Sequence, residues 1–369
     1  MNNKTVFLSA GDISGDNAAS KLVFSLKKLN PNLNFFGLGG NKLKKLGQYQ
    51  LAEPEELAVI GFWEVAKRYL FFRKLLKLCL CEIKNKKPAV VILVDYPGFN
   101  LRLAKLIKGL GIPIIYYISP QIWAWGQKRV KEIKKNIELM LLILPFEEQF
   151  YHNSGVNNIF VGHYLLEEIP SEYISSSAPS NGSLTLMPGS RPQEIEQMLP
   201  PMLKAAKLFK KKCGGRIIIT GVKSFNHYHK YLELYKSEKI EINYDNPLET
   251  IYNSTMVLVS SGTATLETAI IGRPMVVVYK TGFLTYHIAR MLVKLDNISL
   301  VNLILNEKVV PELIQNDVNS ENMFFELEKL YNDKSYYNSI KLKLNKIPEL
   351  LGGKGASERA AKLIISYIN

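Results

Sequence analysis

The chain has 369 residues, of which 47% are hydrophobic and 22% charged, as is typical of a globular protein with substantial cores. Its net charge of +14 favours an anionic partner, such as a nucleic acid, an anionic membrane surface or a phosphorylated substrate. The three cysteines have neither metal-ligand spacing nor a plausible disulfide pairing, which indicates a reducing compartment. No signal-peptide pattern precedes the first predicted strand, and no apolar run approaches the ~20 residues that span a bilayer. The sequence therefore predicts a protein that is soluble or peripheral on a membrane.

The N-terminal stretch predicts a strand over residues 5–10, a small-residue loop over 11–16 and a helix over 17–29. Such a loop can bind a phosphate or a sugar through its backbone N–H groups, which makes Ser14, Gly15 and Asp16 candidate substrate-binding residues. The loop lacks the glycine spacing of a dinucleotide fingerprint and the lysine of a P-loop. The alternative is a plain strand–helix turn with Ser14 or Asp16 as the N-cap.

Residues 61–77 combine a broad aromatic and apolar helical face with interleaved basic residues. Aromatic and basic residues on one helix suit an anionic bilayer interface. A core helix whose basic side chains extend to solvent is the alternative. The residues expected to contact a membrane are Phe62, Val65, Arg68, Tyr69, Phe72, Arg73 and Leu76.

Residues 89–94 form an unbroken apolar run rich in β-branched residues, typical of a strand buried on both faces of a parallel sheet. The run ends in Asp95, and Pro97 and Gly98 then force a turn into a helix. Because the carboxyl ends of parallel strands line the ligand crevice, Asp95 is placed to accept a proton there. Alternatively, Asp95 caps the helix that follows.

Two later stretches of the first half carry unusual residues. Residues 119–126 hold two tryptophans and a proline, which could stack on a sugar or a base or simply fill a core. Pro145 begins a helix with Glu147 and Glu148 in its first turn, where the helix dipole favours acids.

The strand–helix rhythm breaks after residue 168 and then starts afresh, which predicts two Rossmann-like α/β domains with a crevice between them. We expect an N-terminal domain over 1–168, a linker over 169–182 and a C-terminal domain over 183–345. The helix within 346–369 would cross to the first domain or to a partner subunit, so a homodimer is one expected assembly.

Two loops of the second half each follow a predicted strand and enter a helix. Gly189, Ser190 and Arg191 offer backbone N–H groups and a guanidinium that can bridge phosphate oxygens. Ser261, Gly262 and Thr263 begin a helix with small residues, a ready anion site. Glu267 could hold ribose hydroxyls or be a first-turn acid stabilised by the helix dipole. No motif with metal-ligand spacing is present, so the sequence requires no metal.

Eight ordered blocks resemble the lipid-A-disaccharide synthase family, glycosyltransferases of the two-Rossmann-domain GT-B kind (family 19). They are AGDISGD (10–16), VDYPGFN (94–100), SPQIWAWGQKRVKEI (119–133), LPFEEQFY (144–151), VGH (161–163), PGSRPQEIE (188–196), SGTATLE (261–267) and SLVNLI with VPELIQ (299–304 and 310–315). Two positions depart from the family pattern, which usually has Glu in place of Asp12 and Pro in place of Val301.

The resemblance implies an inverting transfer from UDP-2,3-diacylglucosamine to 2,3-diacylglucosamine 1-phosphate, without a cofactor. The products are the lipid A disaccharide phosphate and UDP. Asp95 would remove the proton from the acceptor 6-hydroxyl, and burial should raise its pKa if it has this role. Ser14, Gly15 and Asp16 would face the acceptor. Residues 189–191, residues 261–263, Glu267 and Asn302 would bind the UDP-sugar.

Both substrates carry acyl chains, so the resemblance also implies a cytoplasmic protein peripheral on the anionic inner face of the inner membrane. Two rival functions remain open. One is a GT-B transferase or UDP-sugar epimerase acting on a soluble substrate. The other is a basic nucleic-acid-binding protein, although no recognised nucleic-acid-binding module is visible and we expect no nucleic-acid partner.

Overall fold

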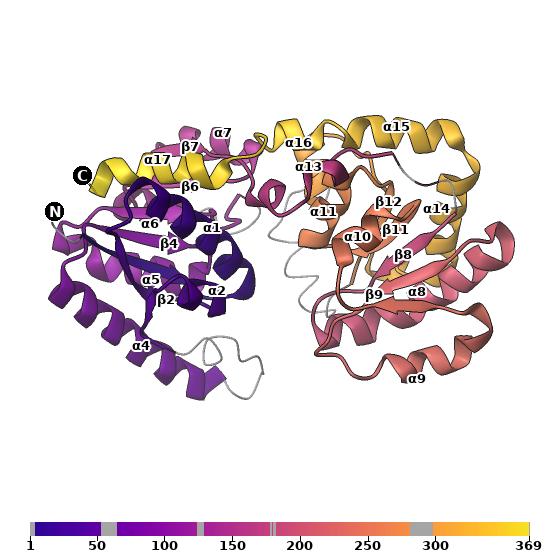
Figure 1. Cartoon of the computed structure of the whole chain (residues 1–369), viewed down its shortest axis with the longest axis horizontal. Coiled ribbons are helices and arrows are strands. Elements are labelled where there is room, and N and C mark those ends of the chain that lie inside the picture. The colour runs from indigo at the N-terminus through magenta and orange to yellow at the C-terminus, as the bar shows by residue number, and fades with distance from the viewer. Residues whose placement is uncertain are drawn as a thin grey trace. The chain divides into compact units, whose positions relative to one another are not determined.

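The computed structural model describes residues 4–52, 65–123, 129–177, 179, 182–280 and 298–368, with the backbone alone over 65–69. The chain forms two compact units, Met1–Tyr164 with Leu351–Asn369, and Leu165–Leu350. Each unit holds a parallel sheet flanked by helices (Figure 1). The predicted α/β class with two Rossmann-like halves is therefore confirmed.

The first sheet has the strand order β3-β2-β1-β4-β5-β6-β7. All of its described pairings are parallel, and β1 lies beside β4 with Val6 opposite Val90 and Ala10 opposite Val94. Its central strands are buried along their whole length, as their apolar β-branched sequences predict. The strands are β1 (Thr5–Ala10), β2 (Asn34–Leu38), β3 (Tyr49–Gln50), β4 (Val90–Val94), β5 (Ile114–Tyr117), β6 (Leu139–Leu142) and β7 (Asn158–Phe160).

The helices of the first unit include the last helix of the chain. That helix, α17, packs against α1 although more than 300 residues separate them in the sequence (Figure 1). The helices are α1 (Ile13–Leu29), α2 (Asn41–Lys45), α4 (Val65–Lys86), α5 (Pro97–Ile107), α6 (Val130–Asn136), α7 (Pro145–Asn153) and α17 (Ala356–Ile368). Short 3₁₀ helices occupy Lys108–Leu110, Tyr164–Glu167, Ser171–Tyr173, Glu233–Glu238 and Gln315–Asp317.

The start of α1 differs from the sequence prediction. The helix begins at Ile13 rather than at residue 17, because Asp12 is the N-cap and its side chain accepts a bond from the Gly15 N–H at 2.6 Å. The predicted caps Ser14 and Asp16 therefore lie inside the helix. A short polar side chain in extended conformation is a strong N-cap wherever it stands, so Asp12, which precedes both predicted caps and was not among them, begins the helix.

The second sheet repeats the same arrangement, with the order β10-β9-β8-β11-β12-β13. Its strands are β8 (Leu184–Met187), β9 (Ile217–Thr220), β10 (Glu241–Asn243), β11 (Met256–Ser260), β12 (Met275–Tyr279) and β13 (Glu312–Ile314). Its helices are α8 (Pro192–Cys213), α9 (Tyr228–Leu232), α10 (Pro247–Tyr252), α11 (Thr263–Ile271), α13 (Leu300–Leu305), α14 (Ser320–Asn332), α15 (Lys334–Leu344) and α16 (Ile347–Leu350).

Both sheets reverse their strand order once, between β1 and β4 in the first unit and between β8 and β11 in the second. Ligands of open parallel sheets bind beyond the carboxyl ends of the strands at this reversal point. The loops that leave these four strands are therefore the places where this rule leads us to expect binding in each unit.

Candidate active site

Asp95 follows β4 at the reversal point of the first sheet. Its backbone N–H donates to the Tyr117 carbonyl oxygen at 3.0 Å. Its own carbonyl oxygen accepts bonds from the Tyr116 hydroxyl at 2.5 Å and from Asn100 Nδ2 at 2.7 Å. Asp95 and Tyr96 both have left-handed backbones, with φ of 45° and 50°. This conformation costs non-glycine residues on the order of 1–3 kcal/mol each and clusters at functional sites.

The pKa of the Asp95 carboxyl group is raised from 3.8 to about 6, first by burial and then by the charge of Asp12, with a backbone hydrogen bond from Tyr96 opposing both. The direction agrees with the sequence expectation for a proton acceptor. The alternative in which Asp95 caps the following helix is wrong, because the N-cap position of α5 is Tyr96 and no side chain caps that helix. A carboxylate with this pKa accepts a proton near neutral pH much better than an ordinary aspartate does.

Asn100 ties the two strands at the reversal point together. Its side chain is fully buried, accepts a bond from Ser9 Oγ of β1 at 2.7 Å and donates to the Val94 carbonyl oxygen of β4 at 3.2 Å. Because the same amide nitrogen also donates to the Asp95 carbonyl oxygen, this one side chain fixes where the catalytic candidate leaves the sheet.

Aromatic rings pack the loops around Asp95 together. A Cβ atom on Gly11, in the loop after β1, would lie 2.2 Å from Tyr96 Cδ1, so only glycine fits beneath this ring. Phe72 of α4 packs against Tyr96 and Phe99, with ring centroids 6.3 and 6.2 Å apart. The loop after β1, the loop after β4 and α4 therefore form one packed group at this edge of the sheet.

The three candidate acceptor residues of the first loop have different surroundings. Ser14 is exposed in the first turn of α1, whereas the Gly15 N–H is used by the cap. Asp16 is buried, with 6% of its surface exposed. Its carboxylate accepts bonds of 2.8, 3.0 and 3.2 Å from the backbone N–H groups of Gly40, Lys42 and Leu43. Asp16 thus fastens α2 to α1, and contact of these residues with the acceptor stays a prediction.

Glu147 is a residue that sequence reasoning did not select. It lies in the first turn of α7 as predicted, but its side chain is buried, with 1% exposed. Its Oε1 accepts bonds from Ser119 Oγ at 2.5 Å and from Trp123 Nε1 at 2.9 Å. Burial raises its pKa to about 7, the two bonds from Ser119 and Trp123 oppose this, and the charge of Asp95 adds to it. The local pattern of an acid early in a helix carried no signal of this burial.

In the second unit, the loop after β8 is closed on itself by Glu194. The N–H groups of Ser190 and Arg191 donate to Glu194 Oε2 at 3.1 and 3.3 Å, and Arg191 Nη1 lies 3.2 Å from Glu194 Oε1. Gly189 has φ of 129°, and a Cβ atom there would lie 2.7 Å from the Glu194 Cβ. The Arg191 side chain is 69% exposed, so its pairing with Glu194 is weak.

The loop after β11 has the open geometry expected of an anion site. Gly262 and Thr263 are exposed at the start of α11, and no atom approaches within 4 Å of a Cβ placed on Gly262. Ser261 is half-buried, and its N–H donates to the Val278 carbonyl oxygen at 2.9 Å. Both loops of the second unit therefore follow the strands that flank its reversal point, β8 and β11.

Glu267 lies beyond the first turn of α11, so the alternative of a first-turn acid stabilised by the helix dipole is wrong. It is half-buried, and burial, followed by the charge of Glu168, raises its pKa to about 7. A carboxyl group that is neutral part of the time can donate as well as accept, which suits a partner with hydroxyl groups.

Asn302 on α13 is fully buried, and all four of its hydrogen-bonding positions are used within the unit. Its Nδ2 donates to the Val310 carbonyl oxygen at 2.9 Å and to Glu312 Oε1 at 2.7 Å. Its Oδ1 accepts from the N–H groups of Val309 and Val310 at 2.8 and 2.9 Å. In this structure its influence on a donor site is therefore indirect, through the segment that it braces.

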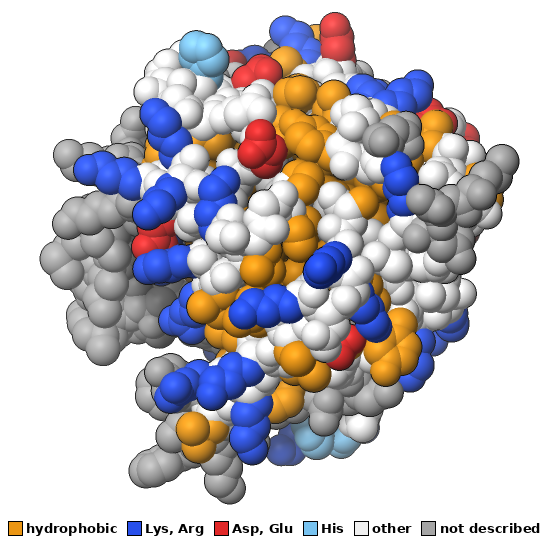
Figure 2. Space-filling model, turned by 90° about the vertical axis from the view of Figure 1, so that its left-hand side faces the viewer, with side chains coloured by type: hydrophobic (Ala, Val, Ile, Leu, Met, Phe, Trp, Pro, Cys, Tyr) orange, Lys and Arg blue, Asp and Glu red, His pale blue; other side chains and the backbone are white. Residues whose placement is uncertain are grey.

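The expected membrane helix is described in part. Phe62 and the side chains of Val65, Arg68 and Tyr69 lie outside the described residues. Phe72 and Leu76 are half-buried and pack against the core of the unit, whereas Arg73 is exposed. Leu70 is 59% exposed and Leu78 41% exposed on the same helix. Figure 2 shows the side of the first unit that lies on the left in Figure 1. On this face, basic side chains lie among hydrophobic ones and acidic side chains are few. No helix among the described residues is long and apolar enough to cross a membrane.

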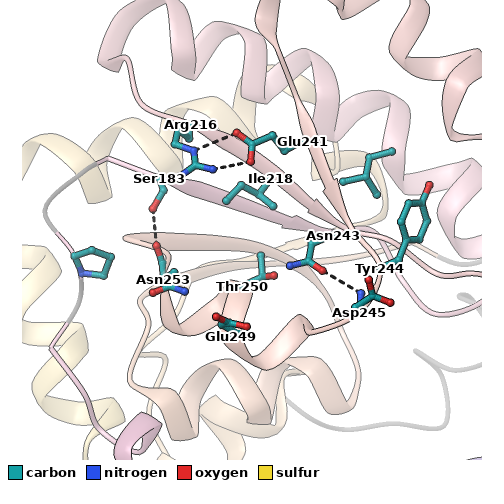
Figure 3. Close-up of a pocket in the computed structure, with 12 residues that line it drawn as sticks. Ser183, Arg216, Ile218, Glu241, Asn243, Tyr244, Asp245, Glu249, Thr250 and Asn253 are labelled. Atoms are coloured by element: carbon teal, nitrogen blue, oxygen red, sulfur yellow. Dashed lines mark hydrogen bonds and ion pairs between the residues drawn. The ribbon is translucent and has the colours of Figure 1, made fainter.

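A pocket of about 540 Å³ lies elsewhere on the second unit, near the amino ends of β8 and β9 (Figure 3). Two of its charged lining residues pair with each other, since Arg216 Nη2 lies 2.6 Å from Glu241 Oε2. None of the candidate site residues lines it. Over the part of the chain that the structure describes, no group of three or more His, Cys, Asp or Glu could hold a metal ion.

Comparison with known proteins adds independent observations. A family model described as lipid-A-disaccharide synthetase matches residues 6–364. A lipid-A-disaccharide synthase of Anaeromyxobacter dehalogenans is 37% identical over 372 residues, which cover 98% of this chain and 97% of the relative. One of Nitrosococcus oceani is 36% identical, with 98% of this chain and 96% of the relative covered.

Solved structures with the same fold are more distant in sequence. The S. aureus MnaA protein, solved with UDP, has a TM-score of 0.67 at 13% identity. The match covers 99% of this chain and 97% of that one. The calicheamicin glycosyltransferase CalG4 has a TM-score of 0.63 at 14% identity, with 100% of this chain and 99% of that chain covered. These similarities agree with the GT-B class expected from the sequence.

Proposed function

The chain belongs to the lipid-A-disaccharide synthase family and is a glycosyltransferase that forms the lipid A disaccharide; we propose that its donor is UDP-2,3-diacylglucosamine and its acceptor 2,3-diacylglucosamine 1-phosphate. The observation that carries the residue assignments is the matching position of the candidate loops at the reversal points of the two sheets. In this proposal the first unit takes the acceptor and the second unit takes the UDP-sugar.

Asp95 is the general base of the transfer. Its carboxylate takes the proton of the acceptor 6-hydroxyl while the oxygen forms a bond to the anomeric carbon of the donor. The bond from that carbon to the diphosphate oxygen breaks, its electron pair leaves with UDP, and the configuration inverts. The raised pKa of Asp95 and its fixed backbone support this role, because a base works best with a pKa near the working pH.

The donor site is assigned to residues 189–191, residues 261–263 and Glu267. The Arg191 guanidinium stabilises the charge that develops on the leaving diphosphate, together with backbone N–H groups at the start of α11. Glu267 binds the ribose hydroxyls. Since Glu194 occupies the N–H groups of Ser190 and Arg191, donor binding must first release that carboxylate.

The uneven charge of the two units supports a peripheral membrane location. The first unit carries 26 Lys and Arg against 13 Asp and Glu, a net +13, whereas the second carries 21 against 20, a net +1. Basic residues close to an anionic leaflet contribute about 1 kcal/mol each to binding. We assign the first unit, with α4, to the anionic cytoplasmic face of the inner membrane, where both acylated substrates lie.

Release of UDP, measured with and without the acceptor lipid, tests the reaction. Acceptor-dependent release by the wild type, lost in Asp95→Ala and Asp95→Asn while UDP still binds, would support the substrates and the base. Normal activity in both variants would remove Asp95 from its role. A folded, UDP-binding protein that shows no acceptor-dependent release would favour a soluble UDP-sugar substrate instead.

Sedimentation with liposomes tests the membrane assignment. Binding should require anionic lipid, fall with salt and weaken when Arg73 and Lys74 are replaced by Gln. Replacing Lys211 and Lys212 of the second unit by Gln is the matched control and should leave binding unchanged. Binding to neutral vesicles that ignores salt would contradict the electrostatic assignment.

A further inference from the structure

The buried carboxyl group of Glu147 has no part in the proton transfer or in the binding of the donor. One oxygen, Oε1, accepts hydrogen bonds from both Ser119 and Trp123. The other, Oε2, is buried and has no hydrogen-bond partner among the described residues. A buried carboxyl group is costly to keep for stability alone, so its position requires an explanation.

Helix α7 holds the segment 119–123 at further points. Tyr151 lies one helical turn after Glu147, and its hydroxyl donates to the Pro120 carbonyl oxygen at 3.1 Å. Phe146 packs edge-on against the Trp123 ring, with centroids 4.8 Å apart. One short helix thus holds four groups of this segment: the Ser119 hydroxyl, the Pro120 carbonyl oxygen, and the N–H and the ring of Trp123.

This segment lies next to Asp95. It follows β5, which pairs with β4 so that Tyr117 stands opposite Val94, and the Asp95 N–H donates to the Tyr117 carbonyl oxygen. Ile118, between the strand and the segment, has φ of 66°, a strained conformation that turns the chain out of the sheet. The charge of Asp95 acts on Glu147 directly, which places the two carboxyl groups in one electrostatic environment.

We propose that Glu147 is a positioning residue of the transfer: with Tyr151 it holds residues 119–123 in one conformation beside Asp95, so that Trp123 presents a ring face to the acceptor sugar. The indole N–H is already used by Glu147, and the ring is half-buried, so its remaining function is contact through its face. The face of an indole ring is apolar and carries partial negative charge, which suits the C–H groups on one side of a sugar. The inference rests on the proposed function, in which Asp95 is the base and the acceptor lies in the first unit.

The test replaces Glu147 by Gln and by Ala, and makes the same two replacements at its neighbour Glu148 as controls. Gln keeps an oxygen that can accept from Ser119 and Trp123, whereas Ala removes both bonds. We expect Glu147→Gln to stay within about threefold of wild-type kcat/KM. Glu147→Ala should raise the acceptor KM by about 10- to 100-fold, the range for a misplaced substrate-positioning group, with the donor KM unchanged. Glu148 is exposed on the same helix, so Glu148→Gln and Glu148→Ala should match the wild type.

A second readout does not depend on activity. In a Trp63→Phe, Trp125→Phe background, the emission of Trp123 reports the segment alone, and acrylamide should quench it more in Glu147→Ala than in Glu147→Gln. Unchanged quenching with an unchanged acceptor KM in Glu147→Ala would overturn the proposal. So would a folded Glu147→Gln as impaired as the Ala variant, since that would require the negative charge rather than the hydrogen bonds.

If Glu147→Ala fails to fold, Ser119→Ala removes one of the two bonds and should shift the acceptor KM in the same direction by a smaller factor. A wild-type acceptor KM in that variant would overturn the proposal. Failure of the proposed function can be told apart from failure of this inference. In that case the wild-type protein would release no UDP with these lipids, while the Trp123 emission would still respond to Glu147→Ala.

Discussion

Replacing Asp95 by Asn should stabilise the first unit while it strongly slows transfer. Burial and the charge of Asp12 raise the pKa of Asp95 from 3.8 to about 6, so the folded protein loses this proton less readily than the unfolded chain does. This difference corresponds to about 3 kcal/mol where the group is ionised in both states. Since Asp95 is half-buried and partly solvated, we expect Asn to recover ~1–2 kcal/mol of it.

The sign of the effect fixes its pH dependence. Above about pH 6 the folded protein carries an ionised carboxylate in an unfavourable place, and Asn removes that cost. As the pH falls from 6 toward 3.8, the folded state keeps its proton and the cost declines. The difference in the free energy of unfolding between Asp95→Asn and wild type should therefore be near zero at low pH and largest above neutrality.

Urea unfolding followed by tryptophan fluorescence measures the free energy of unfolding of the first unit, which contains Asp95. This is because Trp63, Trp123 and Trp125 all belong to that unit. Glu132→Gln, which removes an exposed carboxylate of α6, is the matched control and should show no pH-dependent gain. Transfer by Asp95→Asn should fall by about 10²- to 10⁴-fold, the usual contribution of a general base. An Asn variant less stable than wild type at pH 8 would refute the desolvation argument.

Four further outcomes follow from the same geometry. The wild-type kcat/KM should fall about tenfold per pH unit below about pH 6, as Asp95 becomes protonated, and a flat acid limb would contradict this. Gly11→Ala should impair transfer without weakening UDP binding, because its Cβ would displace the Tyr96 ring; normal kinetics would show that the ring position is irrelevant. Asp16→Asn should destabilise the first unit by about 2–4 kcal/mol, measured by urea unfolding, since its charge-assisted bonds to three N–H groups are weakened. Arg191→Lys should raise the donor KM by about tenfold with the acceptor KM unchanged, because Lys cannot bind a diphosphate bidentately; equal changes in both constants would count against the assignment.

The sequence predicted the framework because local pattern carries it. Buried parallel strands have continuous apolar runs, so the amino-acid pattern alone locates β1, β4, β8 and β11 and the loops after them. Asp95 was selected as a candidate in this way, from the end of one run and the turn that follows. The boundary of α1 was wrong by four residues, since Asp12, Ser14 and Asp16 are all adequate N-caps and local pattern does not rank them.

Residues whose surroundings come from distant parts of the chain could not be read from local pattern. Asp16 binds N–H groups that lie 24 to 27 residues away, and Glu147 binds Ser119 and Trp123, which lie 28 and 24 residues away. Each looks like a solvated acid near a helix start until the fold supplies its partners. Asn302 differs from these acids, because its amide is used entirely by groups that lie 7 to 10 residues away within its own unit.

The two units have similar strand orders but different side chains at the reversal points of their sheets. Both sheets reverse their strand order between their first and fourth strands, so both present loops at an equivalent place. In the first unit that place holds the acids Asp12 and Asp95 among aromatic rings, in a body with a net charge of +13. In the second it holds glycine, small hydroxyl residues and Arg191, in a body that is nearly neutral. In the proposed function, a base that approaches an acylated acceptor at an anionic surface needs the first environment, and a diphosphate that arrives from water needs the second. On that proposal, the division of charge between the two units follows from the two substrates that the reaction joins.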